Sequence, residues 1–384
     1  MTRKEFIQMC GVLGVGMPLS TTLGACSKMP LSPSDKVLII GAGAAGMSAA
    51  YLLQQANVDF EVLEASSTYG GRMKTNKDFA DFPIPLGAEW LHVERDIFSD
   101  IVNDNSVALD VKTMPYDPNI DFGLYEGQEV AVSDIGFTID QKFIGATWLT
   151  FFEDYILPSI ADTIRYNQVV KHIDYSGDKV IVETETEQYT ADRIILTVPL
   201  KILQVGDVQF TPDLPKKKQE AIDEATVWDG FKAFIEFSEK FYPTFIGFDI
   251  TPEEAGQKLY YDAAYGQETN QHILGLFAVG TGAQEYASLS DEELKSYMLA
   301  ELDALFDNQA SANYIKHISQ NWNEEPFAKG AYMYDYERWT RVNRLADSVD
   351  DKIYFAGDAY GFTTDWSSVH VAVRSAKRAV EELV

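Results

Sequence analysis

The first residues suited to chemistry are three glycines that directly follow an apolar strand pattern. Gly41, Gly43 and Gly46 follow the apolar run at residues 37–40 and precede a helical pattern, and a second strand pattern ends at Glu64. The first glycine permits a tight turn, the second lets backbone N–H groups approach a pyrophosphate, and the third lets the helix pack closely on the strand. The pyrophosphate then lies at the helix N-terminus, and the acid binds a ribose hydroxyl. This spacing predicts a dinucleotide-binding site.

A second cluster of such residues follows directly in the chain. Gly70 and Gly71 permit a tight backbone turn, and Arg72 places a cation where it could meet a phosphate or the edge of a flavin ring. Gly87 and Ala88 stand among bulky residues, a composition that suits close approach of the backbone to a flat ligand. Both segments therefore extend the predicted dinucleotide site.

One lysine lies within a strongly apolar segment. Residues 228–237 predict a strand with Phe231 and Ala233 on one face and Lys232 and Glu236 on the other. The ordinary explanation is a solvated lysine on the surface of a sheet. If the side chain is buried instead, its pKa falls because desolvation disfavours the charged form. A buried Lys232 would suit proton handling or oxygen activation.

Charge, cysteines and histidines narrow the classes of partner. The formal net charge is -28, which argues against nucleic acid and is compatible with attraction of cationic ligands or with simple solubility. Both cysteines, Cys10 and Cys26, lie near the N-terminus, and the five histidines have no metal-ligand spacing. We therefore expect no metal site and no nucleic-acid partner.

The N-terminal segment has the composition of a targeting signal. Residues 1–25 start with basic residues, continue with an apolar stretch too short and glycine-rich to span a membrane, and resemble a relaxed twin-arginine signal. They end in Leu23-Gly24-Ala25-Cys26, which resembles a bacterial lipobox, and residues 26–35 indicate a short tether. We therefore expect an exported protein of the periplasmic face or cell envelope, held at the membrane only by an N-terminal lipid on Cys26. A soluble cytoplasmic protein is the alternative.

Two consecutive motifs carry a resemblance to a known family. VLEASSTYGGRM at residues 62–73, followed by LGAEWLH at residues 86–92, resembles the flavin-dependent amine oxidases, which include monoamine oxidases, polyamine oxidases and lysine-specific histone demethylases. TVPLKIL with FTPDLP, a W…P…G.Y pattern at residues 322–332, and the strand that ends in Gly357-Asp358 are similar to further motifs of this family. The resemblance implies FAD as the cofactor.

The resemblance also implies how FAD would be held. Glu64 would bind the adenosine ribose, and the backbone of Val169 or Val170 would meet the adenine. Arg72 would face the flavin, and the backbone of residues 87–90 would contact the isoalloxazine. Relatives with a covalent flavin have cysteine at the position of Ala331, so the FAD of this chain is expected to be noncovalent. The residues expected to bind it are Gly41, Gly43, Ala45, Gly46, Glu64, Ala65, Gly71, Arg72, Gly87, Ala88, Glu89, Trp90, Val169 or Val170, Gly357, Asp358, Ser368 and Val369.

For the chemistry, the resemblance implies three catalytic residues. Lys232 matches the lysine that binds a water molecule beside flavin N5, and Trp322 would flank the flavin. Tyr332 would form one wall of an aromatic cage that guides an amine to the ring. Val369 stands where monoamine oxidases have the second cage tyrosine, so the cage is at best half present. This departure concerns the substrate more than the cofactor.

The order of the patterns predicts an α/β fold with two domains. A Rossmann-like FAD-binding domain would be assembled from three separate segments, and an inserted α+β substrate-binding domain would occupy the rest, in the manner of amine oxidases. The FAD-binding domain would comprise residues 36–95, 165–212 and 340–384, and the substrate domain would comprise residues 96–164 and 213–339.

Local patterns add three helices to this outline. Residues 142–157 predict a helix with an aromatic stripe, which belongs either to a core or to a wall of the substrate cavity. Ser290 and Glu293 have the spacing of a capping box at the start of a helix that ends near residue 306. A C-terminal helix is predicted for residues 369–383.

These observations together predict an FAD-dependent amine oxidase acting on a small-molecule amine. It would oxidise a C–N bond by hydride transfer to the flavin, giving an imine or aldehyde and hydrogen peroxide. Two alternatives stay open: a flavin-dependent desaturase or isomerase of a hydrophobic substrate, and a non-catalytic, lipid-anchored flavoprotein. An amino-acid substrate would require a cation for its carboxylate, for which Arg338, Arg341 and Arg344 are available.

Overall fold

The structure is a computed structural model of the 384-residue chain. It describes residues 32, 34–116, 122–126, 129–132, 140–248, 256–334, 339–361 and 367–384, with the backbone alone at 122–126, 129–132, 339, 340 and 342. The predicted signal at residues 1–25, the lipobox cysteine Cys26, most of the predicted tether before residue 34, and Arg338 lie outside the described residues.

Five parallel strands form the sheet that carries the glycine motif. Their order is β20-β13-β1-β2-β9, with β1 at the centre. The apolar residues of β1, 37–40, are all buried, as expected for a strand that is covered on both faces. The strands are β1 Lys36–Ile40, β2 Asp59–Leu63, β9 Ile164–Arg165, β13 Arg193–Leu196 and β20 Ile353–Phe355.

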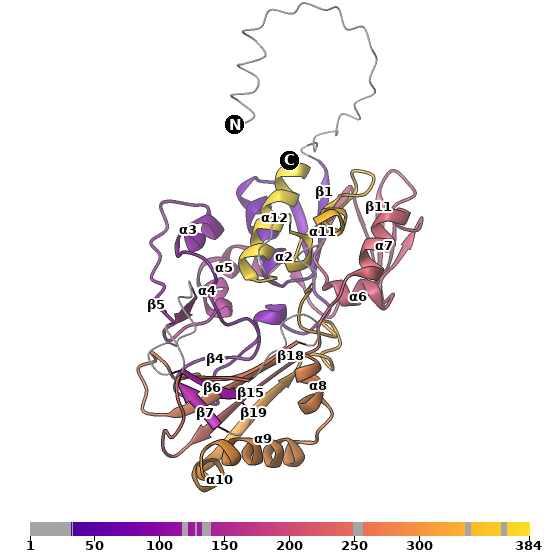
Figure 1. The fold of residues 1–384 in the computed structure, drawn as a ribbon. Helices are drawn as coiled ribbons and strands as arrows, with labels where there is room; N and C mark the ends of the chain where they lie inside the picture. The colour runs from indigo at the N-terminus through magenta and orange to yellow at the C-terminus, as the bar shows by residue number, and fades with distance from the viewer. Residues whose placement is uncertain are drawn as a thin grey trace, which may run out of the picture. The chain divides into compact units, whose positions relative to one another are not determined.

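Different elements pack against the two faces of this parallel sheet. Helices α2 (Ala44–Gln55) and α12 (Val369–Leu383) pack against each other and share a core with one face (Figure 1). The opposite face shares a core with a four-stranded sheet of order β12-β11-β10-β14 and with three helices. These elements are β10 Val170–Asp174, β11 Val180–Thr184, β12 Gln188–Ala191, β14 Gln209–Thr211, α6 Leu200–Gln204, α7 Lys216–Glu224 and α11 Trp339–Ala346.

A seven-stranded sheet of order β19-β15-β18-β17-β16-β6-β7 lies beyond the parallel one (Figure 1). Phe231 of β15 packs with Leu294 of α9 on one face, whereas Phe234 packs with Ile84 on the other. Because side chains alternate along a strand, Lys232 shares the face of Phe234. The elements are β6 Phe122–Glu126, β7 Glu129–Val132, β15 Gly230–Phe237, β16 Phe245–Phe248, β17 Gly256–Asp262, β18 His272–Gly280, β19 Tyr314–Asn321, α8 Thr281–Ala287, α9 Asp291–Leu305 and α10 Gln309–Asn313.

The aromatic segment differs from its prediction at its start. Residues 141–143 form strand β8 (Gln141–Phe143), which pairs with β5 (Thr113–Pro115), and helix α4 begins only at Trp148, so the predicted helical start at Lys142 is wrong. Thr147 caps this helix, because its Oγ1 accepts a hydrogen bond from the backbone N–H of Thr150 at 3.2 Å. The aromatic stripe of α4 (Trp148–Tyr155) packs in the core that contains α2. Part of the predicted substrate-domain segment therefore shares a core with the parallel sheet, while the domain boundaries stay a prediction.

The other two helix predictions are confirmed. Ser290 and Glu293 form a capping box at the start of α9, and α12 spans Val369–Leu383. Within the part of the chain that the structure describes, no helix combines the length and apolar character needed to cross a membrane. The remaining elements are α3 Asp96–Val102, α5 Leu157–Ile160, β3 Thr75–Asn76, β4 Ile84–Pro85, and the short 3-10 helices η1 Gly71–Met73, η3 Ala161–Thr163 and η4 Asp358–Tyr360.

Candidate cofactor and active site

The glycine motif forms the turn between β1 and α2 that the sequence predicts. Gly41 has φ of 108°, a conformation that side chains disfavour, and its N–H donates to Leu63 O at 2.8 Å. A Cβ added to Gly46 would lie 1.9 Å from Gly41 O, so the third glycine is required for close helix–strand packing. A Cβ added to Gly43, at the N-cap of α2, would meet nothing within 4 Å. The helix N-terminus therefore has open space beside it, whereas Ala45 is buried in the core.

Glu64 connects this turn with the segment that follows β2. Its buried carboxylate accepts the backbone N–H of Ala42 at 2.6 Å and that of Ser66 at 2.9 Å. The predicted ribose ligand thus also orders the glycine turn, and Ala65 next to it is partly exposed.

The two valines expected to meet the adenine, Val169 and Val170, directly follow a residue that is hydrogen-bonded to Glu64. Glu64 O accepts the N–H of Gln168 at 2.8 Å, directly before Val169 and Val170. Val170 has its side chain in the core, whereas Val169 is partly exposed, and its carbonyl accepts the N–H of Glu185 at 3.1 Å. Their contact with adenine stays a prediction.

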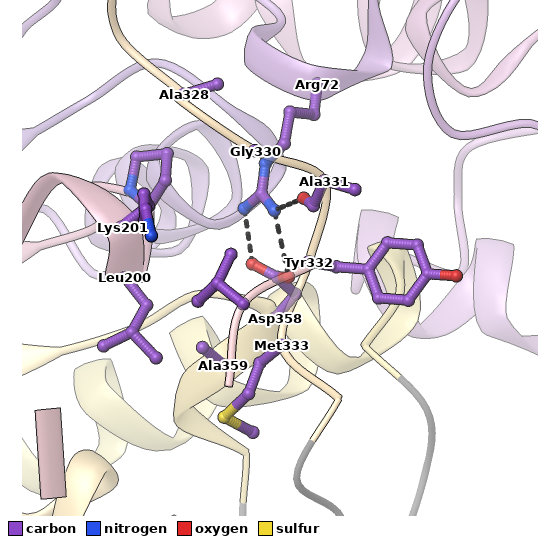
Figure 2. Close-up of a pocket in the computed structure, with 12 residues that line it drawn as sticks. Arg72, Leu200, Lys201, Ala328, Gly330, Ala331, Tyr332, Met333, Asp358 and Ala359 are labelled. Carbon is purple, nitrogen blue, oxygen red and sulfur yellow. Dashed lines mark hydrogen bonds and ion pairs between the residues drawn. The ribbon is translucent and has the colours of Figure 1, made fainter. Parts of the chain in front are cut away.

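Arg72 connects the turn at Gly70 and Gly71 with the Gly357-Asp358 motif that follows β20. Gly70 N–H donates to Ala42 O at 2.9 Å, and a Cβ on Gly71 would lie 3.3 Å from Gly43 Cα. Arg72 reaches Asp358 through two N–H groups, at 2.6 and 3.2 Å, and also donates to the backbone carbonyl of Ala331 (Figure 2). This planar, bidentate pair forms part of the lining of a small cavity with room for about one water molecule.

The end of β20 meets α12 through a side chain that the sequence analysis did not identify. Gly357 N–H donates to Ser375 Oγ at 2.8 Å, which leaves this amide occupied by the protein. At the start of α12, Ser368 is the N-cap residue, and its hydroxyl hydrogen-bonds the ring of His370 at 2.7 Å. Val369 follows as the first residue of the helix and is buried.

The LGAEW segment lies directly against Arg72 and Trp322. Ala88 N–H donates to Arg72 O at 2.9 Å, and a Cβ on Gly87 would lie 1.8 Å from the same oxygen and 3.0 Å from the Trp322 ring. The Trp322 ring nitrogen donates to Leu86 O at 3.0 Å, and the side chain is buried. The backbone at Gly87 is therefore packed as tightly as glycine allows.

Lys232 lies beneath this segment rather than in solvent. Its side chain is buried, and Nζ donates to Pro85 O at 2.9 Å, Gly87 O at 3.1 Å and Glu89 Oε2 at 2.7 Å. Three acceptors match the three N–H bonds of an ammonium group, so a water molecule bound here would have to replace one of them. Burial lowers the pKa of Lys232, and the charge of Glu89 offsets this only in part.

Glu89 has a larger role than the backbone contact predicted for it. Its carboxylate accepts hydrogen bonds from Lys232 and Tyr261, and Lys142 Nζ lies 3.6 Å from Oε1. Burial raises the pKa of Glu89, but the two lysine charges and these hydrogen bonds outweigh it and lower the pKa overall. Trp90 packs beside this group, with its ring 5.2 Å from that of Tyr261. Lys142 and Tyr261 were not predicted as members of this site, and no acid–base pair is evident in the sequence. The only local signal for Lys142 is its position directly before Phe143 in an aromatic-rich segment.

Tyr332 lies in the wall of the cavity near Arg72, but its ring points away from the Arg72–Asp358 pair (Figure 2). The ring is 6.0 Å from that of Trp228, and burial raises the pKa of the hydroxyl. Its role in a cage stays a prediction. Of the candidate carboxylate ligands, Arg341 is bound to Glu224 at 3.0 Å. Across the described ranges, no group of three or more His, Cys, Asp or Glu side chains could hold a metal ion.

Sequence comparisons match two family models and several curated proteins. A model described as flavin containing amine oxidoreductase matches residues 150–384, and one of an NAD(P)-binding Rossmann-like domain matches residues 39–104. Lysine-specific histone demethylase 1B of Mus musculus is 25% identical over 447 residues, covering 94% of this chain and 53% of that protein. Polyamine oxidase 2 of Arabidopsis thaliana is 24% identical over 438 residues, covering 91% and 88%. The chain thus spans about half the length of the demethylases it matches first.

Comparison with solved structures concerns the fold. A double mutant of putrescine oxidase superposes with a TM-score of 0.72 at 17% identity, covering 91% of this chain and 98% of that one. Wild-type putrescine oxidase bound to putrescine gives a TM-score of 0.70 at 17% identity, covering 90% and 98%. The predicted α/β fold with a Rossmann-like dinucleotide-binding domain is confirmed.

Proposed function

Because the chain belongs to the family of flavin-containing amine oxidoreductases, we propose that it oxidises the C–N bond of a small-molecule amine. The cofactor of this family is a flavin, and the Rossmann-like domain identifies it here as FAD. The products would be an imine, which hydrolyses to an aldehyde, and hydrogen peroxide. The related polyamine oxidases and the fold shared with putrescine oxidase support an amine as the substrate.

The residues present fit this cofactor. The open space at Gly43 leaves the N-terminus of α2 free to receive a pyrophosphate, and buried Glu64 lies at the position for a ribose. Arg72 supplies a cation on the flavin side, held in one orientation by Asp358. With Ala331 in place of a cysteine, these contacts would hold FAD noncovalently.

When bound, FAD supplies hydride acceptance from the carbon next to the amine nitrogen. The chain's own residues then bind, orient and exclude water. Buried Trp322 and the tightly packed Gly87 backbone would form the surface beside the flavin, and Tyr332 would offer an aromatic face to a cationic or neutral amine. Lys232 holds a proton at Nζ beside the Gly87 carbonyl.

The observation that carries this proposal is the burial of Lys232 against Pro85 and Gly87. Most lysines are solvated, whereas this one is buried against the segment that the resemblance assigns to the flavin. We expect Lys232→Met to keep FAD and to slow flavin reoxidation or turnover by at least about tenfold, since proton handling beside the ring contributes on that scale or above.

The test is anaerobic mixing of the FAD-loaded protein with amines, polyamines and amino acids, followed by admission of air, with visible absorbance as the readout. Bleaching by an amine that Lys232→Met slows supports the proposal. Lys316→Met is the matched control, because Lys316 lies on the neighbouring strand β19 and its side chain is 45% exposed. Failure of every amine to bleach protein that holds FAD would overturn it in favour of a desaturase, an isomerase or a binding protein.

We further propose that the chain is exported and anchored by a lipid on Cys26, as its N-terminal motif indicates. The test is fractionation of cells that produce the full chain. Cys26→Ser should move the protein from the membrane fraction to the soluble fraction, and an unchanged distribution would contradict the anchor.

A further inference from the structure

A single buried carboxylate faces two buried lysines beneath the LGAEW segment. Glu89 Oε2 lies 2.7 Å from Lys232 Nζ, and Oε1 lies 3.6 Å from Lys142 Nζ. The three side chains are 2–7% exposed and come from β8, β15 and the loop between β4 and α3. We call Lys142, Glu89 and Lys232 the charge cluster.

The two lysines occupy different positions in this cluster. Lys232 donates to three acceptors, including Gly87 O at the proposed flavin side. Lys142 donates to two backbone carbonyls, Asp262 O at 3.2 Å and Ala263 O at 3.0 Å, and has no direct hydrogen bond to Glu89. Lys142 and Glu89, but not Lys232, line a small cavity with room for about one water molecule. Lys142, although buried, is therefore the lysine of the pair that borders this cavity.

The groups around the charge cluster do not fully balance the positive charge of Lys142. Asp262 is the next carboxylate, but its oxygens already accept from Lys240 at 2.9 Å and from the N–H of Ala264 at 3.0 Å. Burial raises the pKa of Tyr261 and Tyr116 well above the ordinary value, so both face the charge cluster as neutral groups. The charge of Asp262 and the rings of Trp90, Tyr116 and Tyr261, 5.4–5.9 Å from Lys142 Nζ, offset part of the lysine charge. With both lysines protonated, the charge cluster therefore keeps a positive charge that is only partly compensated.

A buried charge that is only partly compensated is costly, and one proton released from either lysine removes it. Because the two ammonium groups share one carboxylate, protonation of one weakens the hold of the other on its proton. We infer that Glu89 joins Lys232 and Lys142 into one proton-sharing unit, in which Lys142 is a positioning residue that controls the protonation of Lys232 from the cavity side.

A proton moves through this unit without any other reactant. With Lys142 neutral, Lys232 gives a proton to Glu89 Oε2 and becomes neutral. Rotation of the protonated carboxyl group about Cγ–Cδ turns this same proton toward Lys142, whose Nζ lies 3.6 Å from Glu89, and Lys142 accepts it and becomes the ammonium. The carboxylate is restored and the positive charge has moved to the cavity. This use of the Lys232 proton rests on the proposed function, whereas the coupling between the two lysines does not.

The coupling can be measured in FAD-loaded protein carrying ¹³C at the lysine Cε, by following the Lys232 and Lys142 signals with pH. Wild-type protein should show the same two inflections in both signals. In Lys142→Met, Lys232 should titrate in one step, about one pH unit or more higher, since a tenfold change in proton affinity is one unit. In Lys142→Arg, whose guanidinium stays charged, the single step should lie below that of Lys142→Met.

Lys218→Met is the matched control, since Lys218 is also buried and donates to two backbone carbonyls, those of Leu345 and Asp347, but lies outside the charge cluster. It should leave the Lys232 titration unchanged. An unshifted Lys232 step in Lys142→Met, or an equal shift in Lys218→Met, would overturn the inference. If Lys142→Met does not fold, independent single steps in the wild type overturn it equally. None of these outcomes depends on amine turnover, so the proposed function fails or stands separately.

Discussion

The nucleotide end of the site, around the glycine turn and Glu64, and the charge cluster end, around Glu89, are built from different kinds of contact. At the nucleotide end the contacts are between main-chain groups within about 30 residues of one another in the chain: Gly41 N–H donates to Leu63 O, and Gly70 N–H donates to Ala42 O. The acid there, Glu64, accepts hydrogen bonds from two backbone N–H groups. At the other end, Glu89 is held by side chains from three strands of two sheets.

This difference determines what each end tolerates. The main-chain turn at the nucleotide end depends on shape. One added methyl group therefore disrupts it, whereas a change of charge nearby has little effect on it. A buried charge cluster depends on the balance of charge, because the low-dielectric interior magnifies an unpaired group. Substitutions matched in size but different in charge should therefore separate the two ends, and substitutions that only add volume should do the reverse.

The largest expected effect comes from removing the charge of Glu89. Glu89→Gln leaves Lys232 and Lys142 buried without a carboxylate, which should lower the free energy of unfolding by about 3–5 kcal/mol. Glu64→Gln, the matched change at the nucleotide end, should cost about 1–2 kcal/mol because it weakens one of two neutral-donor hydrogen bonds. Chemical denaturation of both variants measures this, and an equal or larger loss in Glu64→Gln would contradict the distinction between the two ends.

An added methyl group should have the next largest effect, and only at one glycine. Gly46→Ala places a Cβ against the backbone oxygen of Gly41, which cannot rotate away, so we expect a loss of about 2–3 kcal/mol despite the better helix propensity of alanine. Gly43→Ala meets no atom and should change the free energy of unfolding by less than about 0.5 kcal/mol.

The same pair of variants also tests the cofactor site. Gly43→Ala should weaken FAD binding by about tenfold, because its methyl group occupies the open space beside the helix N-terminus. Titration of apoprotein with FAD, followed by flavin fluorescence, measures it. Unchanged affinity in Gly43→Ala would show that the pyrophosphate does not approach there.

The two ends of the site also differ in how much of them the sequence predicts. The glycine turn, the capping box at Ser290 and the extent of α12 were predictable because their causes lie within a few residues of one another. The dinucleotide site and the parallel sheet follow from such local patterns. The helix start was misplaced at Lys142 because Thr147, not the aromatic periodicity, sets where α4 begins.

The charge cluster was not predictable in this way. Burial of Lys232 was suggested only by resemblance to a family, since alternation in β15 places it equally well in solvent or in a second core. Its partner Glu89 lies 143 residues away in sequence, and Tyr261 lies 172 residues from Glu89. Pairings at such separations depend on how two sheets meet, which no local pattern of residues specifies.

A smaller effect should follow from replacing the cation at the nucleotide end. Arg72→Lys keeps the charge but loses the planar fork that binds Asp358 through two N–H groups. We expect FAD affinity to fall by about tenfold, or about 1.4 kcal/mol, with little change in folding. Lys74→Met, at an exposed pair with Glu325, is the control and should leave affinity unchanged. Equal affinity in Arg72→Lys and wild type would remove Arg72 from the flavin site.

The smallest effect concerns how stability varies with pH when Lys142 is replaced. Burial lowers the pKa of Lys142 in the folded state below its ordinary value near 10.5, so between these two values the unfolded chain binds more protons than the folded one. Wild-type stability should therefore rise with pH across that window. Lys142→Met lacks the contribution of Lys142 to this rise, so it should be the more stable protein at neutral pH, by about 1 kcal/mol, and lose this advantage as the pH approaches 10.5.

Lys258, on β17 of the seven-stranded sheet, provides the opposite case. Burial acts to lower its pKa, but Glu301 at 2.7 Å and nearby Glu285 outweigh burial and raise it. Lys258 therefore stabilises the fold at neutral pH, and that stabilisation disappears as the pH rises through its raised pKa. Lys258→Met should be less stable than wild type at pH 7 and approach it above pH 10.5. Denaturation of both variants at a series of pH values measures the two slopes. Slopes of the same sign would show that Lys142 has a full carboxylate partner, and that the charge cluster is balanced after all.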